Sequence, residues 1–310
     1  MVSSVLKPWN HTPLLLSLAM FRRLLTVLEM IKFQHTVFAL PFAVVGAAYG
    51  AMGWPPPATC LWILGAMVGA RSAAMTFNRI VDARFDAANP RTAGRAIPKG
   101  LVSMKFAIGF LVASLALFFA SAAMLNQTVL LLSPVAAVII LGYSFTKRFT
   151  PLSHFVLGLS LALAPVGAWL AVNPLHPTLA WFPVFLGAGV LFWVAGFDIL
   201  YACEDAAFDR SAGLKSVPAA IGIPRALWVA RACHAAALTA FAAPLLFGMM
   251  GWYALAVLVV SLLLVYEHTL VKADDLRRTN RAFFHVNAII SFTLAAGALV
   301  DLALAWSIIP

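Results

Sequence analysis

Nine nearly uncharged apolar runs recur along this 310-residue chain, and they constrain its fold more than any other feature. A helix needs about 20 residues to cross a hydrocarbon core of ~30 Å. The runs show no alternation of period two, and only helices or closed barrels satisfy their backbone in lipid. With 63% hydrophobic residues, the chain exceeds the roughly half that soluble domains contain. The sequence therefore predicts an all-α polytopic membrane protein, with spans near 36–53, 58–77, 104–124, 128–146, 152–172, 179–199, 226–248, 250–270 and 283–306.

The 21 Lys and Arg residues lie on alternate connections between these runs. Four precede the first run, six lie between the second run and the first turn of the third, and two follow the fourth; four lie between the sixth run and the first two turns of the seventh, four follow the eighth, and Arg71 lies inside the second. The connections at 54–57, 125–127, 173–178 and 249, and the tail 307–310, contain none. Because basic residues mark the cytoplasmic side, we expect a multi-pass protein of a bacterial-type inner (plasma) membrane. Its N-terminus is then cytoplasmic and its C-terminus outside.

The net charge of +10 is explained by this topology and by anionic lipid headgroups, so we expect the bilayer as a partner and no nucleic acid. The three cysteines form no CxxC motif, which argues against a zinc site or a disulfide framework. We interpret residues 1–310 as one transmembrane domain. An interfacial or cytoplasmic lead-in, 1–35, precedes two halves, 36–150 and 151–310, in a bundle with a central cavity facing the cytoplasm.

Six of the 11 acidic residues gather in two short stretches, four runs apart. The first stretch reads Asn78-x3-Asp82-x3-Asp86. The second contains Asp198 and Glu204 and reads Tyr201-x3-Asp205-x3-Asp209, offset from the first by 123 residues. A repeated motif at two helix ends predicts two related halves whose acidic stretches face each other across one cavity.

Carboxylates four residues apart lie on one helix face, so each stretch concentrates negative charge. Two carboxylates ~4 Å apart repel by about 1 kcal/mol in water and by about 4 kcal/mol at an effective dielectric constant of 20. Oxygen ligands without His or Cys favour a hard cation, Mg2+ rather than Zn2+, and Mg2+ often completes its shell with water and substrate phosphates. The expected metal ligands are Asn78, Asp82, Asp86, Asp205 and Asp209.

Basic residues accompany both acidic stretches, and Arg is suited to binding phosphate. A diphosphate held by metal at the mouth of an apolar bundle suggests a lipid diphosphate whose tail lies between helices. Arg71 lines the cavity, snorkels toward the membrane surface or pairs with a carboxylate. His35 contacts an acceptor or is a packed, hydrogen-bonded histidine. Two small-residue motifs, Gly46-x3-Gly50 and Gly65-x3-Gly69, are interpreted as helix-packing positions.

The first stretch, continued by Arg91-Thr92 and Arg95-x2-Pro98, resembles the first signature of the UbiA superfamily of intramembrane aromatic prenyltransferases. The segment from Asp198 to Gly222 resembles the second signature. "YSFTKRF", Tyr143 to Phe149, is similar to the basic loop of the family. The resemblance implies Mg2+-dependent transfer of a prenyl group from a polyprenyl diphosphate to an aromatic ring. It also implies catalytic roles for Asp82, Asp86, Asp198, Asp205 and Asp209, and substrate-binding roles for Asn78, Arg79, Arg91, Lys147, Arg148, Tyr201 and Lys215.

Two features leave the substrate open. Many family members have Asp directly after the first Asn of the motif, whereas Arg79 stands here. The segment Lys32 to Ala43 resembles bacterial quinone-pathway members, including those of menaquinone synthesis by the futalosine route. The aromatic acid acceptor is then 4-hydroxybenzoate or a hydroxynaphthoate, whose carboxylate could meet Lys32, His35 or Arg71. The alternatives are an ion-coupled membrane transporter or, within the family, a haem- or chlorophyll-type prenyltransferase.

Overall fold

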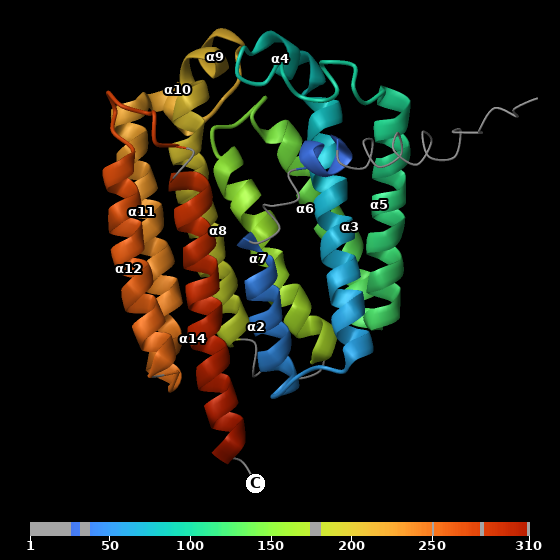
Figure 1. Cartoon of the computed structure of the whole chain (residues 1–310), viewed down its shortest axis with the longest axis vertical. Helices are drawn as coiled ribbons and strands as arrows, with labels where there is room; N and C mark the ends of the chain where they lie inside the picture. Colours follow the sequence, from blue (N-terminus) through green and yellow to red (C-terminus); the bar gives the residue numbers. More distant parts are fainter. Residues whose placement is uncertain (1–25, 32–37, 174–180, 250, 280–281, 309–310) are drawn as a thin grey trace, which may run out of the picture.

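Long helices stand side by side in a single bundle (Figure 1). The computed structural model describes residues 26–31, 38–173, 181–249, 251–279 and 282–308. Within them no strand extends beyond an isolated bridge between Lys272 and Asp275. The long elements are α2 (Leu40–Ala51), α3 (Pro57–Val81), α5 (Met104–Leu125), α6 (Gln127–Thr146), α7 (Ser153–Val172), α8 (Trp181–Ala202), α11 (Ile223–Ala242), α12 (Trp252–Leu270) and α14 (Asn287–Ile308).

The predicted all-α membrane bundle is confirmed. In the described part of the chain, eight helices are long and apolar enough to cross a membrane. The first predicted span corresponds to α2, which is shorter, with 12 residues. At the cavity end, two helices run further than the apolar pattern predicts: α3 continues through Arg79 to Val81, and α8 continues through Tyr201 to Ala202. Both extensions carry polar side chains that line an internal cavity, so they need no contact with lipid.

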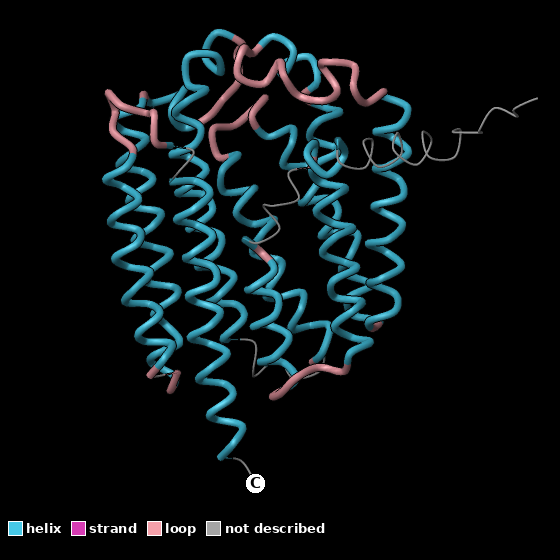
Figure 2. The backbone as a smooth tube through the Cα atoms, in the orientation of Figure 1, coloured by secondary structure: helices cyan, strands magenta, loops and turns pink. Residues whose placement is uncertain are grey.

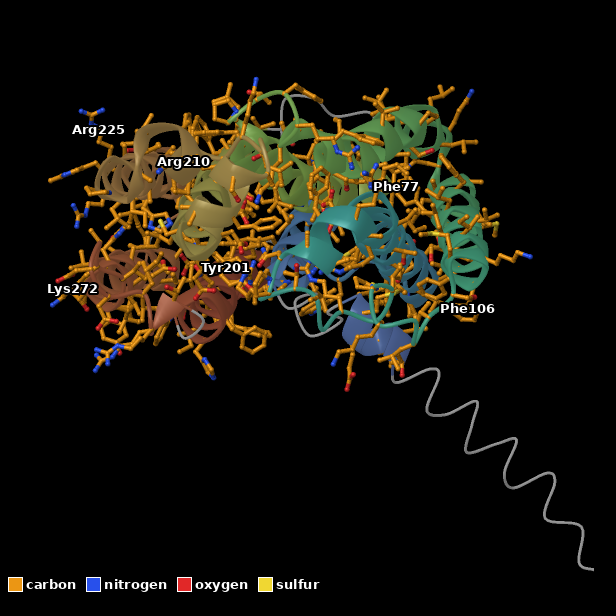
Figure 3. All side chains as sticks on the ribbon, turned by 90° about the horizontal axis from the view of Figure 1, so that it is seen from above. Phe77, Phe106, Tyr201, Arg210, Arg225 and Lys272 are labelled. Carbon is orange, nitrogen blue, oxygen red and sulfur yellow. The ribbon has the colours of Figure 1, made fainter. Side chains whose placement is uncertain are left out.

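Three short helices cover one end of the bundle: α4 (Ala83–Ala88), α9 (Ala206–Ser211) and α10 (Val217–Ile221). Figure 2 shows the loops that join them at the same end, whereas the connections α2–α3 and α5–α6 and the end of α14 lie at the opposite end. The basic connections are thus gathered at the end that carries α4 and α9. Seen from above, Tyr201 lies near the middle of the bundle, and Arg225 and Lys272 lie at its periphery (Figure 3).

The two small-residue motifs bring helix backbones close together, which confirms their interpretation as packing positions. A Cβ added at Gly46 of α2 would lie 2.2 Å from the carbonyl oxygen of Pro165 in α7. A Cβ at Gly69 of α3 would lie 2.7 Å from the backbone nitrogen of Phe118 in α5. Neither neighbour can rotate away, because both are backbone atoms. Helix association of this kind depends on small residues where lipid offers no hydrophobic driving force.

Replacing Gly46 by alanine is expected to lower the stability of the folded bundle by about 1–3 kcal/mol, because a methyl group is forced against the backbone of α7. The matched control is Gly142→Ala on α6, where an added Cβ meets nothing within 4 Å. Thermal unfolding in detergent, followed by circular dichroism, measures the difference. Equal midpoints for the two variants would contradict the proposed close contact.

Helix α8 is held in the bundle by both apolar packing and a buried polar chain. Leu186, Val190 and Trp193 are at most 1% exposed. The indole N–H of Trp193 donates to Oδ1 of Asn287 in α14 at 2.6 Å, and Nδ2 of Asn287 donates to Oε1 of Glu267 in α12 at 2.8 Å. These contacts fix the position and rotation of α8. They thereby determine where its last two turns, with Asp198 and Tyr201, meet the cavity.

Candidate active site

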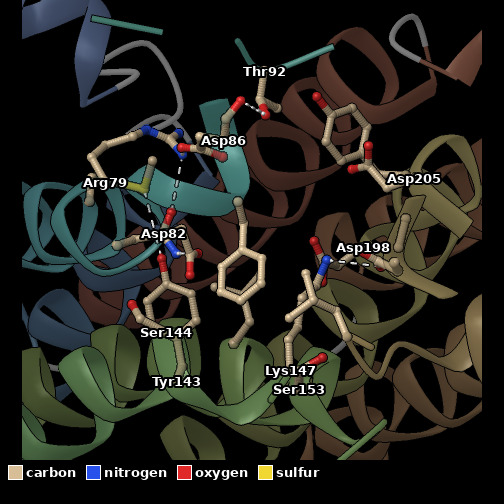
Figure 4. A pocket seen from close by; sticks show the side chains of 18 of the residues that line it. Arg79, Asp82, Asp86, Thr92, Tyr143, Ser144, Lys147, Ser153, Asp198 and Asp205 are labelled. Atoms are coloured by element: carbon tan, nitrogen blue, oxygen red, sulfur yellow. Dashed lines mark hydrogen bonds and ion pairs between the residues drawn. The ribbon is translucent and has the colours of Figure 1, made fainter. Parts of the chain in front are cut away.

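A cavity of about 270 Å3 lies inside the bundle at the end covered by α4 and α9. Its deeper wall is apolar and includes Leu157, Leu161 and Val194, whereas its mouth is charged. The structure brings both acidic stretches to this one cavity. Figure 4 shows Asp82 and Asp86 on one side and Asp198 and Asp205 on the other. The predicted site residues that line it are Asn78, Arg79, Asp82, Asp86, Arg91, Lys147, Arg148, Asp198, Tyr201, Asp205 and Asp209, together with Arg71.

The first acidic stretch keeps its helical spacing although α3 ends at Val81. The backbone N–H of Asp82 donates to Asn78 O and that of Asp86 donates to Asp82 O, at 2.9 and 2.8 Å. The amide of Asn78 donates to Oδ2 of Asp82 at 2.8 Å. These i to i+4 bonds align the three side chains along one face, as the sequence spacing predicts.

Cations surround both carboxylates of the first stretch. Arg148 lies 3.5 Å from Asp82 Oδ1, Arg95 lies 2.6 Å from Asp86 Oδ1, and Arg79 lies 4.0 Å from Asp86 Oδ2. Burial, followed by the neighbouring charge of Asp86, raises the pKa of Asp82. The raised pKa means that the cations present do not fully offset the cost of charging this carboxylate. A further cation at the mouth would stabilise its ionised form.

The second acidic stretch has the same local form, a long helix followed by a short one. Asp205 ends a 3-10 turn after α8, and Asp209 lies in α9. Lys147, at the end of α6, lies 3.4 Å from Asp209 Oδ2. Both carboxylates are buried, with 8% and 3% exposure of Asp205 and Asp209, so their pairing with cations is needed to offset desolvation.

Arg91 and Asn89 join the two stretches across the mouth. The guanidinium of Arg91 forms a bidentate pair with Asp205, in which Nε lies 2.8 Å from Oδ1. The same guanidinium donates to the Tyr201 hydroxyl at 2.7 Å. The side-chain amide of Asn89 also donates to Asp205 Oδ1, at 3.0 Å, and its Oδ1 accepts from Arg91 N. The loop after α4 is therefore fixed against α8, and the two halves of the motif form one unit.

The donor set fits a hard metal ion that shares its ligands with a substrate. In the described residues, no group of three His, Cys, Asp or Glu residues is close enough to enclose a metal by itself. The available ligands are carboxylate and amide oxygens, and Asp86 Oδ2 is buried without a hydrogen-bond partner. Mg2+ commonly uses few protein carboxylates and adds water and phosphate oxygens. Asp82 and Asp86 on one side, with Asp205 and Asp209 on the other, could hold such ions.

Arg71 is a partly buried cation in the middle of a membrane helix, and its Nε atom is buried. It lines the cavity, its Nε has no hydrogen-bond partner, and no carboxylate of the described residues forms an ion pair with it. Unpaired cations at this depth are costly and mark functional sites. Ser153, also on the cavity wall, is a second buried group whose hydroxyl lacks a partner among the described residues. Both groups are available to a polar part of a ligand.

Three predicted residues do not reach the cavity or cannot be assigned to it. Lys215 lies outside the cavity wall: its Nζ donates to Phe149 O at 3.2 Å, and its backbone N–H donates to Lys147 O at 2.6 Å. It therefore anchors the turn that carries Lys147 and Arg148. Lys32 and His35 lie outside the described residues.

Two partners of the acidic residues were missed by reasoning on the sequence alone. Asn89 follows α4 directly before a proline, a typical turn position, which was a usable signal. His154 stands alone at the start of α7, and its Nδ1 lies 2.6 Å from Asp198 Oδ2. A single histidine beside an apolar run carries no sequence signal for such a contact. Arg95 was predicted as a basic residue of the first signature, but its pairing with Asp86 was not.

The cavity thus joins a charged, oxygen-rich mouth to an apolar interior, inside a helical membrane bundle, which suits a ligand with an anionic head and an apolar chain. Residues 39–289 match the model of the UbiA prenyltransferase family. The chain belongs to this family and is a prenyltransferase, which confirms the resemblance found in the two signatures.

Named relatives and solved structures agree with this assignment. The chain is 28% identical over 270 residues to a 4-hydroxybenzoate octaprenyltransferase of Aliivibrio fischeri (strain MJ11), covering 86% of this chain and 89% of the relative. It is 31% identical over 238 residues to the enzyme of the same name from Citrobacter koseri, covering 73% and 79%. The apo structure of a UbiA homologue from Aeropyrum pernix K1 superposes with a TM-score of 0.77 at 36% identity, covering 86% and 98%. A homologue from Archaeoglobus fulgidus, bound to GPP and Mg2+, has the same fold, with a TM-score of 0.70 at 21% identity and coverage of 90% and 99%.

Proposed function

We propose that this prenyltransferase transfers a polyprenyl group from a polyprenyl diphosphate to the ring of an aromatic acid, a precursor of a quinone. The observation that carries the proposal is the convergence of two acidic stretches and their basic partners on one cavity with an apolar inner wall. The names of the relatives support a 4-hydroxybenzoate-type acceptor, and a hydroxynaphthoate remains the alternative. The enzyme would act in a bacterial-type inner membrane with its acidic stretches toward the cytoplasm.

The diphosphate would lie at the charged mouth. Asn78, Asp82, Asp86, Asp205 and Asp209 would hold Mg2+, which a homologue of the same fold binds together with GPP. When bound, Mg2+ would stabilise the negative charge that develops on the leaving diphosphate. Arg79, Arg91, Lys147 and Arg148 would bind phosphate oxygens directly or exchange their carboxylate partners for them. Because the charges are already in place, little reorganisation accompanies the reaction.

The carboxylate of the acceptor would pair with Arg71. This assignment would give the partly buried guanidinium the anion that the described residues do not supply. The Arg71 position, about two turns before Asn78 on the same helix, would place the acceptor deeper than the diphosphate. The prenyl carbon would then lie between the departing diphosphate and the ring that attacks it.

Purified protein in lipid nanodiscs, given labelled polyprenyl diphosphate and Mg2+, is expected to form a prenylated aromatic acid and one diphosphate per product. The acceptor panel contains 4-hydroxybenzoate, a hydroxynaphthoate and the corresponding compounds without the carboxylate. Mass spectrometry identifies the product. Diphosphate release without any prenylated acid from the panel would contradict the proposed acceptor class.

A further inference from the structure

Asp198 differs from the other four aspartates of the cavity in its partner. Asp82, Asp86, Asp205 and Asp209 each have a Lys or Arg side chain within 4.0 Å. In the part of the chain that the structure describes, Asp198 forms its ion-pair contact with a histidine instead, through Oδ2 and His154 Nδ1 at 2.6 Å. Asp198 is therefore not one of the aspartates whose negative charge is offset by a Lys or Arg side chain at the mouth of the cavity.

The histidine in this contact has a defined protonation state. Nε2 of His154 lies 3.3 Å from the backbone nitrogen of Val217, at the start of α10. A backbone N–H can only donate, so Nε2 must be the acceptor and the single ring proton must reside on Nδ1. The ring is fully buried, with 0% exposure, and is fixed at both nitrogens. His154 is thus a neutral donor directed at Asp198.

This geometry leaves one carboxylate oxygen of Asp198 free. Oδ2 accepts a hydrogen bond from Nδ1–H. A proton on Oδ2 that pointed at Nδ1 would clash with the ring hydrogen already there. The side chain is 21% exposed and lines the cavity one helical turn deeper than Tyr201, beside the apolar residues Val194 and Phe197. Oδ1 is consequently the oxygen that is available to take up a proton.

We propose that His154 is a positioning residue, which holds Asp198 as an unprotonated carboxylate whose free oxygen accepts the proton lost from the acceptor ring. The proposal rests on the prenyl transfer proposed above. In that reaction the C–O bond of the prenyl diphosphate breaks, and its electron pair leaves with the diphosphate. A ring carbon supplies the pair for the new C–C bond. The hydrogen on that carbon then leaves as a proton to Asp198 Oδ1, and its C–H pair restores the aromatic ring.

Two substitutions at His154 separate the contact with Asp198 from the contact with Val217. Asparagine can place an N–H near the position of Nδ1, whereas glutamine can place an acceptor near the position of Nε2. His154→Gln is expected to lower kcat by about 10- to 100-fold, because a hydrogen bond to a charged group is lost. The KM for the prenyl diphosphate is expected to change less than twofold. His154→Asn is expected to retain most of the activity.

A double-mutant cycle with Asp198→Asn tests whether His154 acts through Asp198. In the Asp198→Asn background, His154→Gln is expected to have no further effect on kcat. The proposal is overturned if His154→Asn and His154→Gln lose activity equally, as a purely structural link between α7 and α10 would require. It is also overturned if His154→Gln lowers kcat by the same factor in both backgrounds.

Two further measurements complete the test. With an acceptor deuterated at the attacked carbon, His154→Gln is expected to show a normal isotope effect on kcat that the wild type lacks; the absence of this effect would overturn the assignment of the ring proton. Mg2+-dependent binding of an unreactive prenyl diphosphate analogue is expected to be unchanged in His154→Gln. Loss of this binding would overturn the proposal that His154 acts only through Asp198. If the wild type transfers no prenyl group to any acceptor, the proposed function fails independently of His154.

Discussion

Asp82→Asn and Asp205→Asn are each expected to lower kcat/KM for prenyl transfer by about 10³-fold or more, the largest effects that the structure predicts. Asparagine preserves the size of the side chain and one oxygen, but it removes a negative charge from a site that must hold a divalent cation and a diphosphate. Asp82 faces the cavity from the first stretch and Asp205 from the second. Similar losses of kcat/KM in the Asp82 and Asp205 variants would indicate that both aspartates serve one site.

The matched control for these variants is Asp274→Asn, which alters an exposed aspartate on the loop between α12 and α14. It is expected to leave the rate of transfer unchanged. Initial rates with labelled polyprenyl diphosphate, measured at several concentrations of Mg2+, provide the comparison. If Asp205→Asn kept a rate within a few-fold of the wild type, the second stretch would have no part in binding the diphosphate.

Arg71→Gln is expected to raise the KM for an aromatic acid by about 10- to 100-fold, because the acceptor loses a charge-assisted hydrogen bond inside the membrane. The same variant is expected to bind the prenyl diphosphate normally, since Arg71 lies two helical turns away from the first acidic stretch. An acceptor without the carboxylate, such as phenol compared with 4-hydroxybenzoate, is expected to react equally slowly with both forms of the enzyme. Steady-state kinetics with the two acceptors measure the difference.

Arg225→Gln is the appropriate control, because Arg225 is an exposed cation at the periphery of the bundle (Figure 3). It removes a positive charge from the same end of the molecule without altering the cavity. An Arg71→Gln variant whose KM rises equally for acceptors with and without the carboxylate would show that Arg71 maintains the shape of the cavity rather than pairing with an anion.

Most of the architecture follows from the sequence because the bilayer restricts the possible folds. Long apolar runs in lipid must be helices, and the basic residues on alternate connections indicate the direction in which each helix crosses the membrane. The pattern located the helices but not their ends at the cavity. Asn78 and Tyr201 lie in helices that continue past the predicted runs, because a polar residue facing an internal cavity interrupts hydropathy without interrupting the helix.

The acidic half of the site was predictable, whereas its connections were not. Spacing of four residues placed Asp82 and Asp86 on one face, and the repeat of this spacing at Asp205 and Asp209 indicated a common cavity. The pairing of Arg91 with Asp205 joins residues 114 positions apart. Such pairings depend on how the loop after α4 folds over α8, which local spacing does not determine. Lys215 was predicted to bind substrate, but its side chain donates to the backbone carbonyl of Phe149 and does not enter the cavity.

We infer that both acidic stretches hold one metal–diphosphate complex, and a spectroscopic measurement can test this inference. Mn2+ can replace Mg2+ at oxygen ligands, and its electron spin couples to nearby phosphorus nuclei. With an unreactive prenyl diphosphate analogue bound to the wild type, electron–nuclear double resonance is expected to show 31P coupling to protein-bound Mn2+. The coupling should disappear in both Asp82→Asn and Asp205→Asn. Bound Mn2+ without 31P coupling in the wild type, or coupling that persists in either variant, would show that the two stretches do not hold one metal–diphosphate complex.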